Sequence, residues 1–170
     1  MEKETDHERT LVLIKPDGLD KSITGNIITA LSAEGLKIVA SKIVKVTEKF
    51  AKEHYSELRE GLKEKFGDDE GKEVFRNVID YSQGNYHTHR VMALVYDGPD
   101  AVKRVRGVAG ETNPEKAHPR SIRGKYGRIH SETSVFENVI HCSDSVENAE
   151  KEIGLWFKDS EVVDYEDRFN

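Results

Sequence analysis

Long apolar runs and cysteines are scarce in this sequence. No stretch approaches the roughly 18 consecutive apolar residues of a membrane-spanning helix, so no membrane anchor is expected. The opening residues 1–8 are charged and lack the apolar segment of a secretory signal, which is typical of a short frayed tail. Because the only cysteine, Cys142, has no partner for an internal disulfide, a reducing compartment is favoured. We therefore expect a cytoplasmic protein.

An excess of basic charge is also missing. The 170 residues include 26 Lys and Arg against 32 Asp and Glu, a net charge of −6 at pH 7. This balance argues against a protein that covers nucleic acid with a basic face, so no specific nucleic-acid partner is expected. A phosphate site must instead be a local basic pocket. The length fits one compact domain, and we expect a single domain over residues 1–170.

Hydrophobic periodicity and turn residues predict an α+β fold. The predicted strands are residues 10–14, 36–46, 91–96 and 138–142, and the predicted helices are residues 24–34, 47–55, 74–84, 100–110 and the segment that begins near residue 144. This order matches a ferredoxin-like βαββαβ plan, a mostly antiparallel sheet covered by helices, which we expect on one face. Residues 59–72 lose the pattern and predict a solvated loop or frayed helix. Residues 111–137 form a long polar stretch without a period, and such loops are usually functional or disordered.

His141 ends the last predicted strand and is followed by the start of a helix. Free backbone N–H groups at a helix N-terminus favour an anion nearby. A lone histidine there is more often a structural residue than a nucleophile. Glu152, on the helix that follows, has the spacing to hold one imidazole nitrogen and leave the other free to attack.

Two well-known phosphate and metal patterns are incomplete. A P-loop is absent, because Gly71-Lys72 is followed by Glu73 where Ser or Thr is required. His87 and His89 have the spacing to share one strand face, but a metal site needs a third ligand. The basic residues Lys15, Arg106 and Arg123 are spread along the chain, and each alone is more often part of a solvated face.

Four ordered motifs resemble the nucleoside diphosphate kinases. They are Ile-Lys-Pro-Asp-Gly at 14–18, Gly-Glu-Thr-Asn-Pro at 110–114, Ser-Ile-Arg-Gly at 121–124 and Asn-Val-Ile-His-Cys-Ser-Asp-Ser-Val-Glu at 138–147. The resemblance covers residues 8–165. It implies an enzyme that transfers the γ-phosphate of a nucleoside triphosphate to a nucleoside diphosphate by a ping-pong mechanism, with ATP and GDP among its substrates.

The resemblance also implies roles for individual residues. His141 matches the phosphorylated nucleophile, and Glu152 and Ser143 match the groups that orient it. Six more residues match family positions that contact the nucleotide's phosphates or ribose, or that lie near the histidine. They are Lys15, Tyr55, Arg106, Thr112, Arg123 and Asn138. Mg²⁺ would arrive with the phosphates, because no carboxylate cluster has ligand spacing. Ungapped matching places Val74, with Phe75 beside it, where the family often has an aromatic residue that stacks on the base.

The family forms hexamers or tetramers, which implies a homo-oligomer. We expect a hexamer assembled from dimers, with residues 111–124 taking part in subunit contacts. The chain is longer than the family pattern at residues 61–73, 83–90 and 126–137, all bordering the nucleotide region. A catalytically weak nucleotide-binding scaffold of the same fold is the alternative. It is disfavoured because the key residues are all present. An RNA-binding module would need exposed aromatics on a basic surface, whereas the predicted strands carry aliphatic residues.

Overall fold

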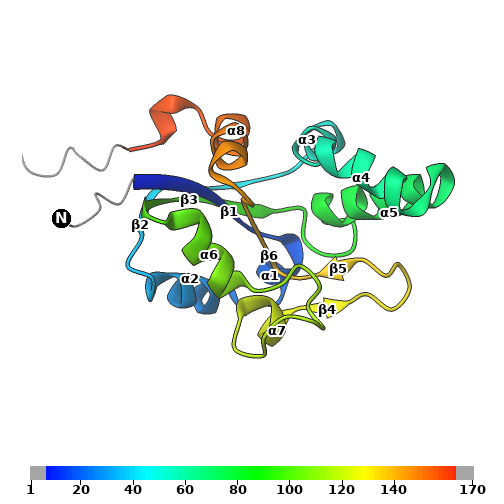
Figure 1. Ribbon diagram of the computed structural model, residues 1–170, viewed down its shortest axis with the longest axis horizontal. Helices are drawn as coiled ribbons and strands as arrows, with labels where there is room; N and C mark the ends of the chain where they lie inside the picture. The colour runs from blue at the N-terminus through cyan, green and yellow to red at the C-terminus, as the bar shows by residue number, and fades with distance from the viewer. Residues whose placement is uncertain (1–6, 164–170) are drawn as a thin grey trace, which may run out of the picture.

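The computed structural model describes residues 7–163. Its centre is a four-stranded antiparallel sheet in the order β2-β3-β1-β6. The strands are β1 (His7–Ile14), β2 (Lys37–Val44), β3 (Val91–Pro99) and β6 (Ile140–Cys142). This is the predicted ferredoxin-like arrangement, with β1 and β3 in the middle (Figure 1). Most of the tail expected at residues 1–8 lies outside the described residues, and its last two residues, His7 and Glu8, belong to β1.

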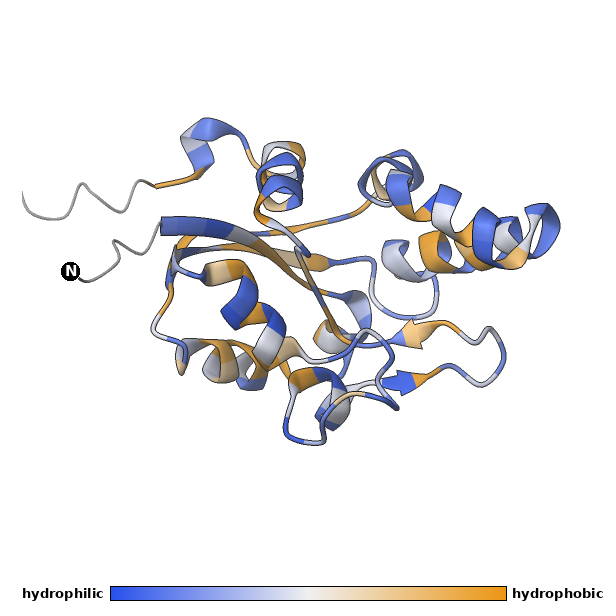
Figure 2. Ribbon diagram, viewed as in Figure 1, coloured by the Kyte–Doolittle hydropathy of each residue, from blue (hydrophilic) through white to orange (hydrophobic). Residues whose placement is uncertain are grey.

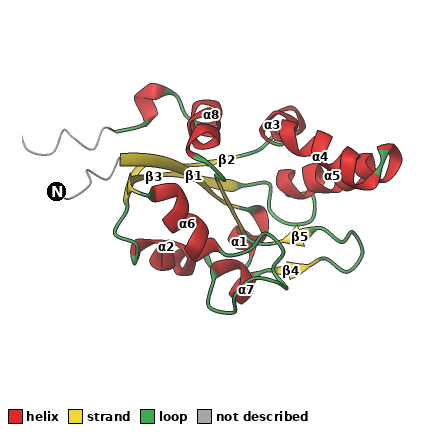
Figure 3. Cartoon of the chain, viewed as in Figure 1, coloured by secondary structure: helices red, strands yellow, loops and turns green. Residues whose placement is uncertain are grey.

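Helices cover both faces of the sheet, so the expectation of a single covered face is wrong (Figures 1 and 3). The cause is the unbroken apolar run of β1. Leu11 and Leu13 point to one face, where they pack with α3 (Glu48–His54), α5 (Asp68–Gln83) and α8 (Val146–Trp156). Val12 and Ile14 point to the other face, against α2 (Thr24–Ser32) and α6 (Ala101–Ala109). A strand that is apolar on both faces is stable only when both are covered.

The segment around residues 59–72 is helical rather than a loop. α4 (Ser56–Phe66) and the first turns of α5 form a hairpin around Gly67, whose φ of 83° suits glycine. α4 is rich in strong helix formers but buries no residue, and Figure 2 shows it mainly hydrophilic. Its apolar residues Leu58, Leu62 and Phe66 recur every four residues, a sparse helical period among charged residues, and Leu62 packs partly buried against the core. Gly71 is where the two helices meet, since a Cβ there would lie 2.9 Å from the Leu62 carbonyl oxygen.

Short elements replace turns and loops elsewhere. The segment after β1 forms α1 (Pro16–Asp20) instead of a simple turn. Residues 111–137 contain α7 (Ile122–Tyr126) and a hairpin of β4 (Arg128–Ile129) and β5 (Phe136–Glu137). A short 3-10 helix, η1 (Asp159–Glu161), follows α8. In the described part of the chain, none of the helices is long and apolar enough to cross a membrane.

Candidate active site

A pocket of about 630 Å³ lies where the ends of β1, α3, α6, α7, β6 and α8 converge. A volume of this size suits a nucleotide-sized ligand. Most of the residues singled out from the sequence line it. They are Lys15, Tyr55, Arg106, Thr112, Arg123, Asn138, His141 and Glu152. Folding therefore brings together residues that lie far apart in the chain.

His141 is held by Glu152. The Nε2 atom of His141 lies 3.0 Å from Oε1 of Glu152, and the hydroxyl of Ser143 donates to the other carboxylate oxygen at 2.5 Å. The Ser143 hydroxyl also accepts from the backbone N–H of Leu11 at 3.2 Å, which ties the carboxylate to the central strand. Burial would raise the pKa of Glu152, but the hydrogen bonds from His141 and Ser143 lower it below its usual value. An ionised carboxylate only accepts, so Nε2 carries the imidazole proton and Nδ1 keeps its lone pair.

Asn138 connects two other pocket residues. Its side-chain oxygen accepts from Nζ of Lys15 at 2.9 Å, and its amide nitrogen donates to the carbonyl of Thr112 at 2.8 Å. Burial lowers the pKa of Lys15 to about 8, and Asp17 nearby opposes this shift. The lysine is thus a partly desolvated cation whose attraction for phosphate is weakly screened.

Arg123 and Arg106 differ in how firmly they are held. Arg123 is buried and donates to the carbonyls of Gly110 at 2.7 Å and Ile140 at 3.1 Å. Its Nε is buried without a hydrogen-bond partner in the described structure. Desolvation lowers the pKa of this guanidinium, whereas Cys142, near its Nη2, has the opposite effect. Arg106 is exposed on α6 and reaches the pocket from its rim.

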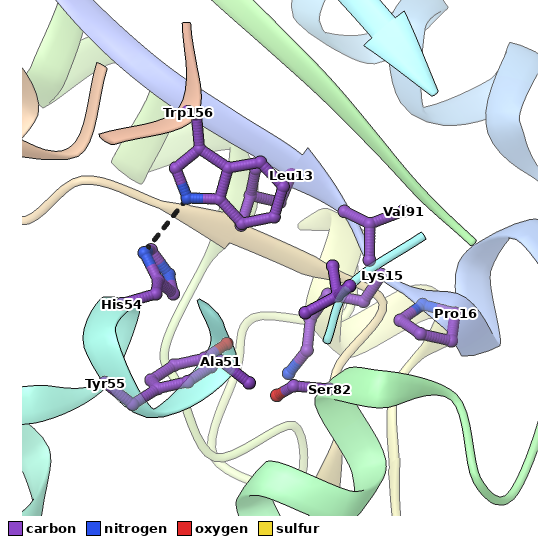
Figure 4. A pocket seen from close by; sticks show the side chains of 10 residues that line it. Leu13, Lys15, Pro16, Ala51, His54, Tyr55, Ser82, Val91 and Trp156 are labelled. Carbon is purple, nitrogen blue, oxygen red and sulfur yellow. Dashed lines mark hydrogen bonds between the residues drawn. The ribbon is translucent and has the colours of Figure 1, made fainter. Parts of the chain in front are cut away.

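His54 is a pocket residue that sequence reasoning missed, because neither a motif nor a local pattern singles it out. Its ring packs edge-on against His141, with ring centroids 4.7 Å apart. Its Nδ1 lies 3.2 Å from the indole Nε1 of Trp156, as Figure 4 shows. An indole N–H only donates, so Nδ1 accepts and the proton of His54 is on Nε2. Burial lowers the pKa of His54 to about 3. The cavity in Figure 4 holds only about 10 Å³, far too little for a nucleotide.

His54, His141 and Glu152 bring possible metal-ligand atoms within 4.8 Å of one another. Their hydrogen bonds argue against a metal site. Nδ1 of His54 accepts from Trp156, which places the proton of His54 on its Nε2. Nε2 of His141 donates to Glu152, so the proton of His141 is on that nitrogen. A metal bound by Nε2 of His54 would require the loss of the hydrogen bond between His54 and Trp156, and Glu152 already accepts from His141 and Ser143. The arrangement therefore favours an oriented imidazole.

Val139, two residues before His141, has a left-handed backbone with φ of 60°. A β-branched residue rarely adopts this conformation, so the surrounding structure must hold it. The Val139 N–H donates to the Asp17 carboxylate at 3.1 Å, and its carbonyl accepts from the backbone N–H of Lys15 at 2.9 Å. The strained residue thus fixes the end of β1 against the strand that carries His141.

The expectation for Val74 and Phe75 is not supported. Neither lines the pocket, and Phe75 is buried in the core between α5 and the sheet. Val78, one turn after Val74 on α5, lines the pocket instead. His87 and His89 also take separate roles, since His87 contacts Glu137 and His89 contacts the Gln83 carbonyl.

The sequence is similar to a known enzyme family over nearly its whole length. A family model described as nucleoside diphosphate kinase matches residues 8–162. The nucleoside diphosphate kinase of Archaeoglobus fulgidus is 40% identical over 159 residues, covering 94% of this chain and 92% of that protein. Nucleoside diphosphate kinase A of Homo sapiens is 39% identical over 158 residues, which cover 93% of this chain and 91% of that protein.

Solved structures agree. A transition-state mimic of the nucleoside diphosphate kinase from Borrelia burgdorferi with bound vanadate and ADP has a TM-score of 0.79 at 31% identity, covering 94% of this chain and 92% of that chain. An NDP kinase from Pyrobaculum aerophilum has a TM-score of 0.78 at 31% identity, and the match covers 94% of this chain and 100% of that chain. The likeness therefore extends to the backbone fold over nearly the whole chain.

Proposed function

The chain belongs to the nucleoside diphosphate kinase family, and from this premise we propose that His141 carries the phosphoryl group between the two substrates. The protein is a nucleoside diphosphate kinase, which transfers the γ-phosphate of a nucleoside triphosphate to a nucleoside diphosphate. The observation that carries the proposal is the free Nδ1 of His141, left by the bond from Nε2 to Glu152. We take residues 1–170 as one such kinase domain.

Each half-reaction moves one phosphoryl group. Nδ1 of His141 attacks the γ-phosphorus, the N–P bond forms, and the bond to the bridging oxygen breaks, so the nucleoside diphosphate leaves with that electron pair. Glu152 balances the positive charge that develops on the imidazole. A terminal oxygen of a second nucleoside diphosphate then attacks the same phosphorus, and His141 departs with the electrons of the N–P bond. The scaffold alternative lacks both steps.

The remaining pocket residues hold the phosphates. Lys15, Arg106 and Arg123 supply positive charge, and Thr112 and Asn138 supply polar groups beside them. Tyr55 closes the same end, with its ring centroid 6.4 Å from that of His141. Phosphoryl transfer depends mainly on positioning and on neutralising charge on the moving oxygens, which is what this set provides.

The pocket suits Mg²⁺ that enters with the nucleotide. Mg²⁺ prefers oxygen ligands and retains waters. Among residues 7–163, the only group of three possible metal ligands is His54, His141 and Glu152, a nitrogen-rich set that suits Mg²⁺ poorly. The phosphates themselves would therefore be its main ligands. When bound, Mg²⁺ neutralises charge on the phosphate oxygens.

We also propose a homo-oligomer, a hexamer in preference to a tetramer. Support comes from β2, an edge strand of the sheet on which Ile38 and Ile43 are 46% and 60% exposed. Such an apolar edge is usually covered by another chain. Light scattering at micromolar concentration tests this, and a monomer would contradict it. Cytoplasmic location is proposed from the single cysteine, which agrees with a reducing compartment.

The test of His141 uses γ-labelled ATP. The protein should retain a label that is acid-labile and base-stable, as expected for a phosphohistidine, and peptide mapping should place it on His141. Adding unlabelled nucleoside diphosphate should remove the label as triphosphate. Absence of label would favour the scaffold alternative, and a label on Ser143 would contradict the assignment of the nucleophile.

A further inference from the structure

The ammonium group of Lys15 lies over an aromatic ring. Its Nζ is 4.6 Å from the centre of the ring of Tyr81, a residue of α5. The side-chain oxygen of Asn138 accepts from the same Nζ at 2.9 Å. The face of an aromatic ring carries partial negative charge, so it attracts a cation at this distance. Lys15 is therefore held by two groups, a ring face and an amide oxygen.

We propose that Tyr81 is a positioning residue whose ring face keeps Lys15 charged and beside Asn138, where the ammonium meets the phosphates. The proposal rests on the proposed function, because this lysine needs its charge to bind a phosphate. Tyr81 acts through Lys15 and does not have to contact the nucleotide itself. A ring face suits this task because it attracts the cation without neutralising it, whereas a paired carboxylate would repel the phosphate.

The contact depends on the ring and not on a charged hydroxyl. Tyr81 is only 1% exposed, and burial raises the pKa of its hydroxyl, so the side chain is neutral. An ion pair between a phenolate and Lys15 is therefore excluded. The attraction that remains is the one between the cation and the ring face.

Desolvation distinguishes this contact from others of its kind. Lys65 and Lys125 also lie over aromatic rings, with Nζ 5.0 and 5.2 Å from the ring centres, but both lysines are exposed. Exposed contacts contribute less, because water competes for the cation. Lys15 has lost part of its water, and burial lowers its pKa to about 8. The ring face opposes the shift that burial causes.

Charged groups from other elements also act on Lys15. Asp17 of α1 and Glu137 of β5 favour its charged form, and Arg123 of α7 disfavours it. The other ionisable side chains at this end of the pocket are His54, Tyr55, Arg106, His141, Cys142 and Glu152. A substitution of Tyr81 leaves all of these groups in the chain. A change in the titration of Lys15 then reports the loss of the ring.

The ring of Tyr81 is supported from residues 83–90, where the chain is longer than the family pattern. The ring of His87 packs against it at an interplanar angle of 78°, with centroids 6.0 Å apart. Nε2 of His87 in turn lies 2.6 Å from Oε1 of Glu137, which is only 1% exposed. These contacts restrict the ring, so Lys15 meets a face of fixed orientation.

The experiment measures the pH dependence of kcat/KM for phosphorylation by ATP. Tyr81→Leu removes the ring face, and the midpoint of the alkaline fall should move down by about 0.4–1.5 pH units, the attraction of a ring for a cation expressed as a pKa shift. For a midpoint near 8, this lowers kcat/KM at pH 8 by roughly 2- to 15-fold, with a smaller effect at pH 6.

Two variants serve as controls. Tyr81→Phe keeps a ring face and should retain the wild-type midpoint. Tyr96→Leu changes a tyrosine that is equally buried, at 1% exposure, but belongs to the core on the other face of the sheet. Its midpoint should also match wild type, because it removes a buried ring without touching Lys15.

A ring-fluorinated phenylalanine in place of Tyr81 keeps the shape of the ring but withdraws charge from its face. Its midpoint should lie between those of Tyr81→Phe and Tyr81→Leu, and this comparison decides the question if Tyr81→Leu does not fold. NMR titration of isotope-labelled lysines in the nucleotide-free protein should give the same order of midpoints. Lys15→Arg assigns the signal.

Two outcomes overturn the proposal. A midpoint that stays at the wild-type value in Tyr81→Leu and in the fluorinated variant would show that the ring only packs. An equal shift in Tyr81→Phe and Tyr81→Leu would assign the effect to the hydroxyl. The lysine titration needs no nucleotide, and labelling of wild-type His141 by ATP needs no Tyr81 variant. Failure of this proposal is therefore distinguishable from failure of the proposed function.

Discussion

Nε2 of His141 lies 3.0 Å from Oε1 of Glu152. Glu152→Gln keeps an oxygen that accepts from the imidazole but removes the negative charge. The phosphorylated imidazole then loses its counter-charge, and we expect the phosphorylation rate to fall by roughly 10- to 150-fold, the range of a charged hydrogen bond. Single-turnover kinetics with ATP measures this. Glu150→Gln, which changes an exposed carboxylate of α8 paired with Arg9, is the matched control. An equal rate in both variants would contradict the role of Glu152.

The lowered pKa of Lys15 predicts that kcat/KM falls at alkaline pH. Burial lowers its pKa from 10.5 to about 8, so the free enzyme loses this positive charge as the pH rises through about 8. We expect kcat/KM to fall above that pH, whereas kcat should persist to higher pH, because bound phosphate favours the charged lysine. In Lys15→Arg the alkaline limb should disappear from this range. If kcat/KM of Lys15→Arg falls at the same pH as in wild type, the fall belongs to another titrating group.

The lowered pKa of Lys15 also predicts how the free energy of unfolding depends on pH. Between pH 8 and 10.5 the unfolded chain binds more protons at Lys15 than the folded one, so the free energy of unfolding gains a positive contribution as the pH rises through this window. Urea denaturation at pH 8 and 10 should show a smaller gain, or a larger loss, in Lys15→Met than in wild type. Identical pH dependence in the two proteins would mean that the lysine is not desolvated.

Much of this architecture follows from sequence, and the exceptions have physical causes. The four strands were predicted because β1 and β3 are apolar runs ended by turn residues. For α4 the sequence predicts only a solvated loop or frayed helix, because just three apolar residues, Leu58, Leu62 and Phe66, mark its helical period. The phosphate-contact residues came from motifs, and the structure brings them to one pocket. The motif comparison placed a base contact at Val74 and Phe75, but neither residue lines the pocket.

His54 shows a second limit of sequence reasoning. Its burial depends on Trp156, 102 residues later, so no local pattern indicates it. Likewise, the left-handed Val139 is held by Asp17 and Lys15 from the distant β1 end. Strained or buried polar residues of this kind depend on tertiary contacts and run against local propensity.

Arg106 and Arg123 should separate binding from stability. Arg106→Ala should weaken transition-state binding by about 2–4 kcal/mol, the loss of one preorganised electrostatic donor, without lowering Tm, because the side chain is exposed. Arg123→Ala should lower kcat/KM on the same scale and also lower Tm, since it leaves the carbonyls of Gly110 and Ile140 without their donor. Steady-state kinetics and thermal denaturation check both. Wild-type kcat/KM in either variant would contradict its assigned role.

His54 should make the fold sensitive to acid. Its pKa is lowered from 6.5 to about 3 by burial, so the unfolded chain binds more protons in this window. The stability that neutral His54 contributes is present above pH 6.5 and is lost as the pH falls towards 3. Between pH 7.5 and 4.5, His54→Phe should therefore lose less free energy of unfolding than wild type. His89→Asn, at an exposed histidine, should behave as wild type. Equal losses in all three proteins would contradict the buried neutral state.

His141→Ala should abolish phosphotransfer while leaving the fold and nucleotide binding largely intact. The substitution removes the atom that forms the covalent intermediate, so the reaction path is lost rather than one contact weakened. The side chain is partly exposed, at 20%, and Lys15, Arg106 and Arg123 remain to hold phosphates. Circular dichroism and calorimetric titration with ADP check these two points.

In wild type, double-reciprocal plots with donor and acceptor varied should give parallel lines, because the first product leaves before the second substrate binds. Direct transfer between two bound nucleotides would give intersecting lines. Intersecting lines together with residual activity in His141→Ala would show that a phosphate can pass without the histidine. In that case the bond between His141 and Glu152 would serve to build the pocket, and the nucleophile would have to be sought among the substrate oxygens.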